Sequence, residues 1–118
     1  MAHTLEMTLS LKMDGLPYPG FPLSRRLQVD EVASLGYEQD AGAGYTNLAA
    51  VFTSLSVVVL TTDQALSLRC NNQSNGSIPL NSGGLVVVFD GAIDTATLLS
   101  VLNSGGTNAN MNGILGGT

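Results

Sequence analysis

The clearest pattern in the chain is the strict alternation of apolar and polar residues between Thr4 and Met13. Every odd position in this segment is apolar and every even position is polar. A β-strand places alternate side chains on opposite faces, whereas a helix would scatter them around its axis. We therefore predict a half-buried strand whose inward face carries five side chains, namely Leu5, Met7, Leu9, Leu11 and Met13.

The segment 13–22 is rich in proline and glycine, and we predict that it forms a loop or the extension of an edge strand. Proline has no backbone N–H to donate to a strand ladder, and its ring fixes one backbone torsion. Two aromatic residues of this loop, Tyr18 and Phe21, have two interpretations. They either contact a partner from the surface or fold back over the core as a lid.

The stretch from Leu23 to Val32 resumes the character of a strand, with Leu27 and Val29 alternating. Its last three residues break the alternation, which indicates a bulge or the end of the strand. Residues 33–53 show no decisive pattern, because their short apolar runs fit a strand or a helical turn equally well. This segment stays unassigned.

From residue 54 onward the chain consists of short strand-like segments separated by turns rich in glycine, asparagine and serine. The predicted strands are 54–60, 65–70, 77–80, 85–89, 97–103 and 108–115, with a turn at 71–76 and a loop at 90–95 among the connections. The first of these strands is rich in valine, which indicates burial on both faces or at a subunit contact. The third contains Pro79, which places it at a sheet edge.

Strands at intervals of about ten residues, with no amphipathic helix between them, are typical of a β-sandwich or barrel. We therefore predict an all-β fold with one domain over residues 1–118. The tail 116–118 is expected to be flexible unless a neighbouring segment holds it.

The composition argues against several classes of partner. Only 11% of the residues are charged, compared with roughly 25% in typical soluble proteins. The formal net charge of −5 would repel the phosphates of a nucleic acid, so we expect no nucleic-acid partner. The longest apolar run, Leu85 to Phe89, is far too short to span a membrane, and the first residues show no secretory signal. We expect no membrane partner either.

Few residues could support catalysis or metal binding. His3 has no second ligand at a metal-binding spacing, and Cys70 lies at an apolar position of an alternating strand, as a buried structural thiol would. Asp90 and Asp94 are the best candidates for a cation, but two acids in a turn more often cap backbone N–H groups. We therefore predict a protein that is not an enzyme and has no catalytic residue, metal site or cofactor.

Residues 61–115 carry a recurring order of short motifs. Thr62-Asp63-Gln64-Ala65-Leu66 opens an alternating strand that ends in Asn71-Asn72, and an apolar strand and the segment Asn108 to Leu115 follow. This order resembles that of small structural proteins of tailed bacteriophages, a group that includes capsid cement (decoration) proteins and small tail or fibre components. The resemblance implies a β-sandwich of jelly-roll type, assembly as an oligomer, often a trimer, and no catalytic residues.

We therefore expect a non-enzymatic virion protein, made in the cytoplasm of a bacterial host, that binds the outer surface of the capsid. Its expected partners are further copies of itself, as a homotrimer, and the major capsid protein. The residues expected to contact partners come from the proline-rich loop, the first strand and the C-terminal strand, and they are Leu16, Tyr18, Phe21, Leu5, Met7, Ile114 and Leu115.

Two alternatives stay open. The first is a tail or fibre component of the same kind of particle. The second is a carbohydrate-binding module on a β-sandwich, for which the only plausible aromatic platform consists of Tyr18, Phe21, Tyr37 and Tyr45.

Overall fold

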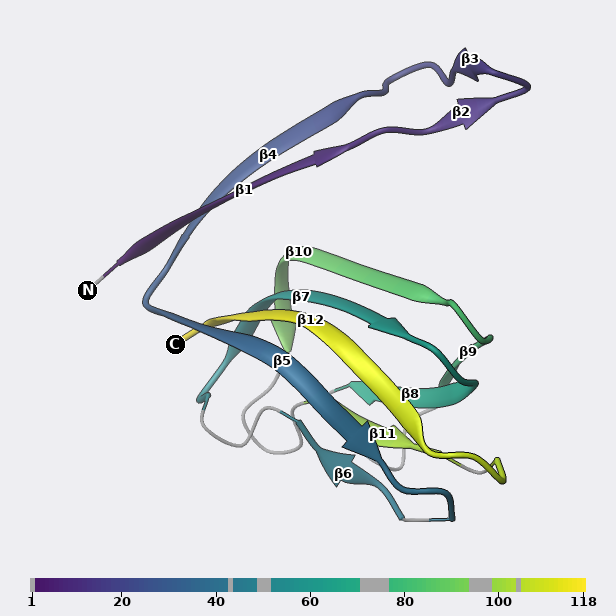
Figure 1. The fold of residues 1–118 in the computed structure, drawn as a ribbon. Helices are drawn as coiled ribbons and strands as arrows, with labels where there is room; N and C mark the ends of the chain where they lie inside the picture. Colours follow the sequence, from purple (N-terminus) through teal and green to yellow (C-terminus); the bar gives the residue numbers. More distant parts are fainter. Residues whose placement is uncertain (1, 43, 49–51, 71–76, 94–98, 104) are drawn as a thin grey trace.

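The computed structural model describes residues 2–42, 44–48, 52–70, 77–93, 99–103 and 105–118, and within these residues the protein is all-β. Two four-stranded antiparallel sheets pack on each other as a β-sandwich, and a long N-terminal hairpin stands beside them (Figure 1). The predicted all-β sandwich is thus confirmed.

The first sheet has the strand order β10-β7-β12-β5, and the second has the order β6-β11-β8-β9. The strands of the first sheet are β5 (Glu31–Gln39), β7 (Leu55–Thr62), β10 (Leu85–Ile93) and β12 (Ala109–Gly117). Those of the second sheet are β6 (Thr46–Asn47), β8 (Leu66–Cys70), β9 (Ile78–Leu80) and β11 (Leu99–Leu102). Pro79 lies in β9 at the edge of its sheet, as predicted.

The strands of the sandwich are paired in a nested way. The first strand of the sandwich pairs with the last, β5 with β12, and the next pairs inward are β6 with β11, β7 with β10 and β8 with β9. Two further pairings, β7 with β12 and β8 with β11, join these pairs into sheets. The chain therefore folds as one long double ribbon that is wound over both layers.

The core lies between the two sheets. Val58 and Leu60 of β7 share one apolar cluster with Leu68 of β8 and Val101 of β11, and all four side chains are fully buried. Val57 points to the opposite side of β7 and is only 1% exposed. Of the two outcomes that the valine-rich pattern indicated, burial on both faces is the one found for Val57 and Val58 of β7.

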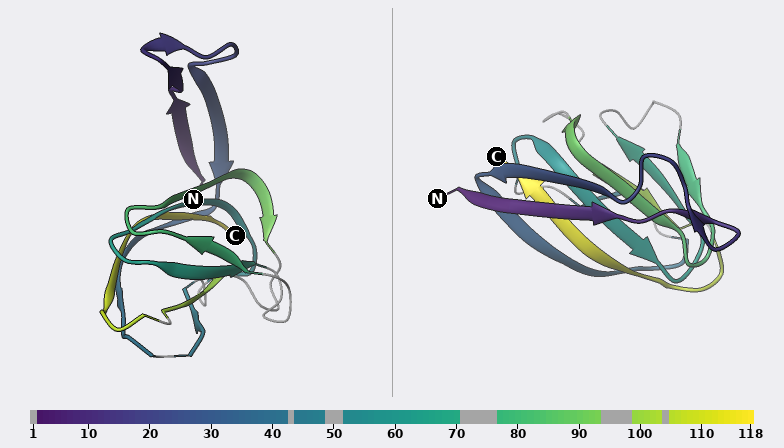
Figure 2. Two further views of the ribbon diagram at one scale, coloured as in Figure 1. Left: turned by 90° about the vertical axis from the view of Figure 1, so that its right-hand side faces the viewer. Right: turned by 90° about the horizontal axis from the view of Figure 1, so that it is seen from above.

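The N-terminal hairpin, residues 2–29, is called the arm below. Its strands β1 (His3–Leu9) and β4 (Leu23–Val29) pair antiparallel along their full length, from His3 opposite Val29 to Leu9 opposite Leu23. The short strands β2 (Lys12–Met13) and β3 (Leu16–Pro17) close the tip around Asp14 and Gly15. Both turn residues have positive φ, 54° and 81°, which is the geometry that Asp-Gly favours in a tight hairpin turn. Figure 2 shows the arm projecting from the sandwich.

The structure corrects the expectations for the first 22 residues. The alternating segment forms two strands instead of one, and Leu11 and Met13, which we expected to face inward, are 48% and 61% exposed. The physical reason is that the arm rises away from the first sheet toward its tip, so that its last apolar positions are not covered by the sandwich (Figure 1). The proline-rich segment is the tip of this hairpin and does not form a lid over the core.

Other segments differ from the sequence predictions in length or order. The unassigned stretch contains most of β5 and all of β6, and β10 continues through residues 90–93, where we expected a loop. Asp30 ends the arm, as the break in alternation indicated. The tail is ordered, because Gly117 lies in β12 between β5 and β7, its carbonyl accepts a bond from the Asp30 N–H, and Thr118 bonds Ser54. The predicted turn at 71–76 lies outside the described residues.

A buried amide fixes the loops at one end of the sandwich. Asn103 is fully buried, and its Nδ2 donates to the carbonyls of Gln39 (3.1 Å) and Thr107 (2.8 Å). Its Oδ1 accepts from the Gly105 N–H at 3.0 Å, and its carbonyl accepts from the Gly42 N–H at 3.0 Å. One side chain therefore links the ends of β5 and β11 with the loop that leads into β12.

Candidate assembly surface

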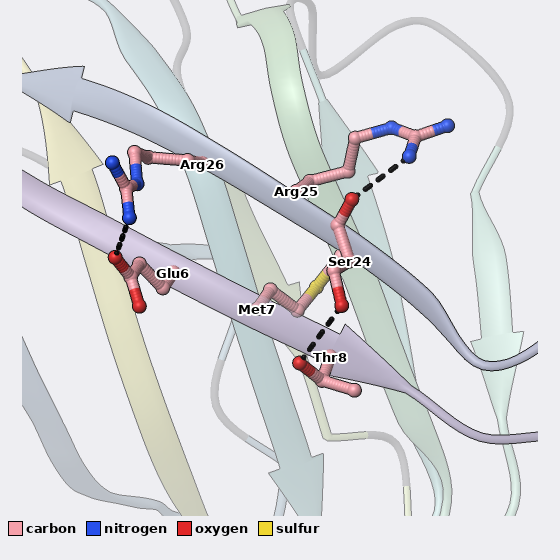
Figure 3. A pocket seen from close by; sticks show the side chains of 6 residues that line it. All are labelled: Glu6, Met7, Thr8, Ser24, Arg25 and Arg26. Atoms are coloured by element: carbon pink, nitrogen blue, oxygen red, sulfur yellow. Dashed lines mark hydrogen bonds and ion pairs between the residues drawn. The ribbon is translucent and has the colours of Figure 1, made fainter.

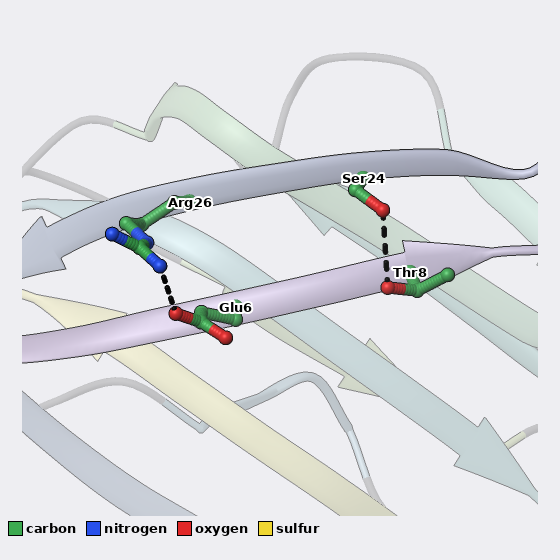
Figure 4. A network of polar contacts seen from close by, with 4 residues as sticks. All are labelled: Glu6, Thr8, Ser24 and Arg26. Atoms are coloured by element: carbon green, nitrogen blue, oxygen red, sulfur yellow. Dashed lines mark hydrogen bonds and ion pairs between the residues drawn. The ribbon is translucent and has the colours of Figure 1, made fainter.

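The arm has a polar face that is satisfied by its own residues. Glu6 lies opposite Arg26 in the strand register, and the Arg26 guanidinium contacts the Glu6 carboxylate at 2.6 Å (Figure 4). Thr8 lies opposite Ser24, and their hydroxyl groups share a hydrogen bond of 3.3 Å. Such directly opposed pairs stabilise a ribbon by roughly 0.2–1 kcal/mol each. These contacts add to the backbone pairing of the two strands on one face of the arm.

The same residues surround a shallow hollow of about 240 Å³ on the arm (Figure 3). Met7 contributes to its lining, and Arg25 points away from the Glu6–Arg26 pair while its guanidinium donates to the Ser24 carbonyl at 2.9 Å. The hollow is open to solvent, and its lining is mainly polar. Its groups are bonded to one another, which makes it a weak candidate for a ligand site.

The opposite face of the arm is apolar. It carries Leu5, Met7 and Leu9 from β1 and Leu23 and Leu27 from β4, and each of these side chains is half-buried. At its base the arm is tightly packed, since Val29 is 4% exposed. A Cβ placed on Gly116 of β12 would lie 3.0 Å from Leu5 Cδ1 and 3.4 Å from Val29 Cγ2. The apolar face of the arm is thus turned toward the outer face of the first sheet.

That outer face is apolar as well. Because Val58, Val86 and Leu115 face the core, strand alternation turns their neighbours outward. These neighbours are half-buried hydrophobic residues, and they include Val59, Val87, Phe89 and Ile114. The apolar face of the arm therefore lies opposite the apolar outer face of the first sheet. The two faces are in contact at the base of the arm and move apart toward its tip (Figure 1).

The tip carries the largest exposed apolar side chains of the arm. Leu16 is 71% exposed and Tyr18 is 45% exposed, next to Leu11 and Met13 on the neighbouring strand segment. The tip is well ordered, because the Tyr18 N–H donates to the Leu11 carbonyl at 2.9 Å. An open hollow of about 410 Å³ lies among Met13, Asp14, Leu16, Pro17, Tyr18 and Pro19. Exposed apolar clusters on an ordered element are typical of interaction sites.

The structure separates the residues that the sequence grouped as contact candidates. Leu16 and Tyr18 are exposed at the tip, and Phe21 is half-buried beside it. Leu5 and Met7 lie on the apolar face of the arm, and Ile114 lies on the outer face of the first sheet. Leu115 packs in the core at 2% exposure, so we remove it from the candidates.

The sequence reading missed other residues of this surface. Leu11 and Met13 follow the alternation of β1, so periodicity alone predicted that their side chains face the core. The signal that could have corrected this is Asp14-Gly15, which marks a tight hairpin turn directly after them. Leu23 and Leu27 share the apolar face with β1 and were not singled out either.

The arm and the sandwich carry opposite charge. The arm has three basic side chains, Lys12, Arg25 and Arg26, against two acidic ones, Glu6 and Asp14, which gives a formal charge of +1. The remainder of the chain has one basic and seven acidic side chains, which gives −6. Among the described residues, Arg26 has a carboxylate partner within 4 Å, whereas Lys12 and Arg25 have none.

At the end of the sheet beneath the arm tip, Asp63 is bound to Asn110. Its carboxylate accepts from the Asn110 N–H at 2.7 Å and from Asn110 Nδ2 at 3.1 Å, and its own N–H donates to the Asn110 carbonyl at 3.1 Å. The backbone and side-chain bonds from Asn110 lower the pKa of Asp63 below its ordinary value. This carboxylate therefore fixes the turn after β7 to β12.

The other candidate groups are scattered. His3 is exposed at the start of β1, and Asp90 is exposed in β10 with a φ of 62°. Asp94 and the side chain of Cys70 lie outside the described residues. Within the part of the chain that the structure describes, no three His, Cys, Asp or Glu residues are grouped to hold a metal ion. A search of that same part found no helix long and apolar enough to cross a membrane.

The four aromatic residues considered for a carbohydrate platform do not form one surface. Tyr18 and Phe21 belong to the tip of the arm, whereas Tyr37 lies on the edge strand β5. Tyr45 lies next to the second sheet, where Cζ of the Arg69 guanidinium is 4.3 Å from the centroid of the Tyr45 ring.

Comparisons of the chain with protein-family models, with curated proteins and with solved structures found no match.

Proposed function

We propose that this chain is a non-enzymatic structural protein of a virus particle, an oligomeric cement protein that binds the outer surface of a bacteriophage capsid. The observation that carries the proposal is the arm, whose ordered tip presents Leu11, Met13, Leu16 and Tyr18 to solvent beyond the sandwich. A protein that acts by holding other proteins together needs such a surface. The expected partners are other copies, as a trimer, and the major capsid protein.

The topology supports the same class of protein. We infer that the sandwich is a jelly roll, because its eight strands pair first with last and so on inward across two four-stranded sheets. Jelly rolls occur in viral capsid proteins and in lectins. The fold alone does not choose between these functions, so the proposal rests on the exposed surface of the arm.

The exposed apolar side chains of the tip could contribute substantially to the free energy of a contact. Burying a Leu or Met side chain completely stabilises a complex by about 1.5–3 kcal/mol. Leu16 is 71% exposed and Met13 is 61% exposed, so these two residues alone offer about 2–4 kcal/mol. That corresponds to a factor of roughly 30 to 1,000 in affinity.

Immunogold electron microscopy of particles purified from the source culture tests the proposal. We expect gold on the heads. Gold on the tails would support the alternative of a tail or fibre component, and particles without any gold would refute a virion role.

A matched pair of variants tests the arm as the contact. Leu16→Ser together with Tyr18→Ser should abolish binding to isolated heads in a co-sedimentation assay. The control Ile78→Ser removes a side chain of similar exposure, 49%, from β9 of the sandwich and should bind like the unmodified protein. Equal binding by both variants would exclude the tip as the attachment point.

A carbohydrate-binding module is the second candidate. It is favoured by one observation, the hollow at the tip that Tyr18 and Asp14 line together. An aromatic ring beside a carboxylate could stack on a sugar and accept hydrogen bonds from its hydroxyl groups. A glycan array on which Tyr18→Ala loses the signal would support this function, and an array without binders would exclude it.

A further inference from the structure

We propose that the arm is exchanged between copies, so that the apolar face of one arm docks on the outer sheet face of a second copy of this chain. This inference rests on the proposed role in assembly and specifies the partner of the arm. Three features carry it, namely the link at Asp30, the two incompletely covered faces and the distribution of charge.

The link between the arm and the sandwich is very short. β4 ends at Val29 and β5 begins at Glu31, so Asp30 alone reverses the chain over the sheet. Its N–H is held by the Gly117 carbonyl at 3.0 Å. With this one-residue link, the arm does not lie flat on the first sheet but rises from it toward its tip (Figure 2). Short hinges of this kind favour exchange between copies.

Exposure along the arm follows this rise. Val29 at the base is 4% exposed, Met7 and Leu9 further along are half-buried, and Met13 at the tip is 61% exposed. If the chain extends at Asp30, β4 and β5 become continuous and the arm reaches a neighbour. On that neighbour it can lie flat over its whole length, so the same contacts form and the outer half of the arm gains further ones.

The area reaches the lower limit for a specific pair. A ribbon of two seven-residue strands measures about 24 Å by about 10 Å, which gives a face of roughly 240 Å². A reciprocal exchange covers two arm faces and two sheet faces, or about 1,000 Å², which is the smallest area expected of a specific interface. The four exposed side chains of the tip add to this area.

The charges also favour a second copy as the occupant. Two sandwiches of formal charge −6 repel each other, whereas an arm of charge +1 attracts a sandwich. Arg25 lies opposite Met7 in the register and is exposed, on the side of the arm that would meet the neighbour. Its guanidinium is not neutralised by a carboxylate within the described part of its own chain.

Cross-linking between single-cysteine chains tests the exchange. In a Cys70→Ser background, Leu5→Cys is placed in one chain and Gly116→Cys in another, because Leu5 packs against Gly116. The two chains are unfolded together, refolded at high concentration and oxidised. We expect the disulfide-linked heterodimer to exceed both homodimers several-fold, since neither chain can form an internal disulfide.

A second pair, Met7→Cys with Ile114→Cys, keeps the test valid if Gly116→Cys fails to fold. The two thiols of this pair are linked with a short bismaleimide instead of a disulfide. Light scattering is measured in parallel on the unmodified protein. An oligomer without heterodimeric cross-links from either pair would overturn the exchange while leaving assembly intact. A monomer at all concentrations would overturn both.

The charge argument has its own matched control. Arg25→Gln and Thr4→Glu both change the net charge from −5 to −6, but Thr4 lies on the polar face of the arm. We expect Arg25→Gln to raise the dissociation constant of the oligomer about tenfold and Thr4→Glu to raise it less than twofold. Equal effects would refute the docking of this face.

Discussion

Replacement of Gly113 by alanine should unfold the sandwich at a much lower temperature than the same replacement at Gly36. Both glycines lie in the first sheet, Gly113 in β12 opposite Leu35 and Gly36 in β5 opposite Asn112. A Cβ on Gly113 would overlap the carbonyl oxygen of Val59, lie 2.8 Å from its carbonyl carbon and lie 3.1 Å from Leu60 Cα. A Cβ on Gly36 would meet no atom within 4 Å.

The magnitude follows from these contacts. Carbon atoms normally approach to about 3.5–4.0 Å, so β7 and β12 would have to separate by roughly 1 Å. Strain of this kind costs about 1–3 kcal/mol, and each weakened ladder bond adds about 1 kcal/mol. We expect a loss of about 3–5 kcal/mol out of a total stability of about 5–15 kcal/mol. At this chain length, that lowers the melting temperature by roughly 12–20 °C.

Thermal and urea unfolding followed by circular dichroism measure both variants. Gly36→Ala should lie within about 1 kcal/mol of the unmodified protein, and on the stable side, because alanine restricts the unfolded chain more than glycine does. Melting temperatures within 3 °C of each other, a difference of about 1 kcal/mol, would show that β7 and β12 do not approach as closely as the structure has them.

Three further changes test other parts of the fold. Leu68→Ala should cost about 2–5 kcal/mol in urea unfolding because it opens a cavity in the core, and a smaller loss would contradict its full burial. Asn103→Ala should cost about 2–4 kcal/mol because it removes the buried amide that donates to the Gln39 and Thr107 carbonyls, and a neutral effect would show that this link is dispensable. Asp63→Asn should destabilise at pH 7. The folded pKa of Asp63 lies below its unfolded value, so its contribution is present above about pH 4 and disappears as the pH falls through the folded pKa. The gap in melting temperature between Asp63→Asn and the unmodified protein should therefore narrow as the pH falls below about 4, and a constant gap would contradict the role of its charge.

The sequence predicted local structure well where one rule of alternation sufficed. The strand around Leu68 follows from alternation and the strand around Val58 from a run of apolar residues, and turn residues mark where both end, because these are local properties of the sequence. The arm shows the limit. Its alternation predicts a strand with one apolar face, but the same pattern fits a strand inside a sandwich, and Leu11 and Met13 were therefore placed in the core.

The missing information concerns contacts between distant segments. Gly117 reads as a free end in the sequence, yet its position is fixed by β5 and β7, which lie far away in the chain. Likewise Asn103 resembles any other asparagine of a turn, although it is buried among three carbonyl and N–H partners. The turn at the tip of the arm could be predicted from Asp14-Gly15, but its projection could not, since that depends on how the arm leaves the sandwich.

The place of β12 in the middle of the first sheet has a consequence for folding. The strand that joins β5 to β7 comes latest in the sequence of the sandwich, so the sheet is split until residues 109–117 arrive. Before that, β5 and β7 both present open edges, and nearly all of the pairing involves residues far apart in the chain, which makes folding slow. A chain that stops before β12 should expose two unpaired edges and aggregate. The nested pairing thus makes folding depend on the whole sandwich sequence, because a stable sandwich forms only once β12 has paired with β5 and β7.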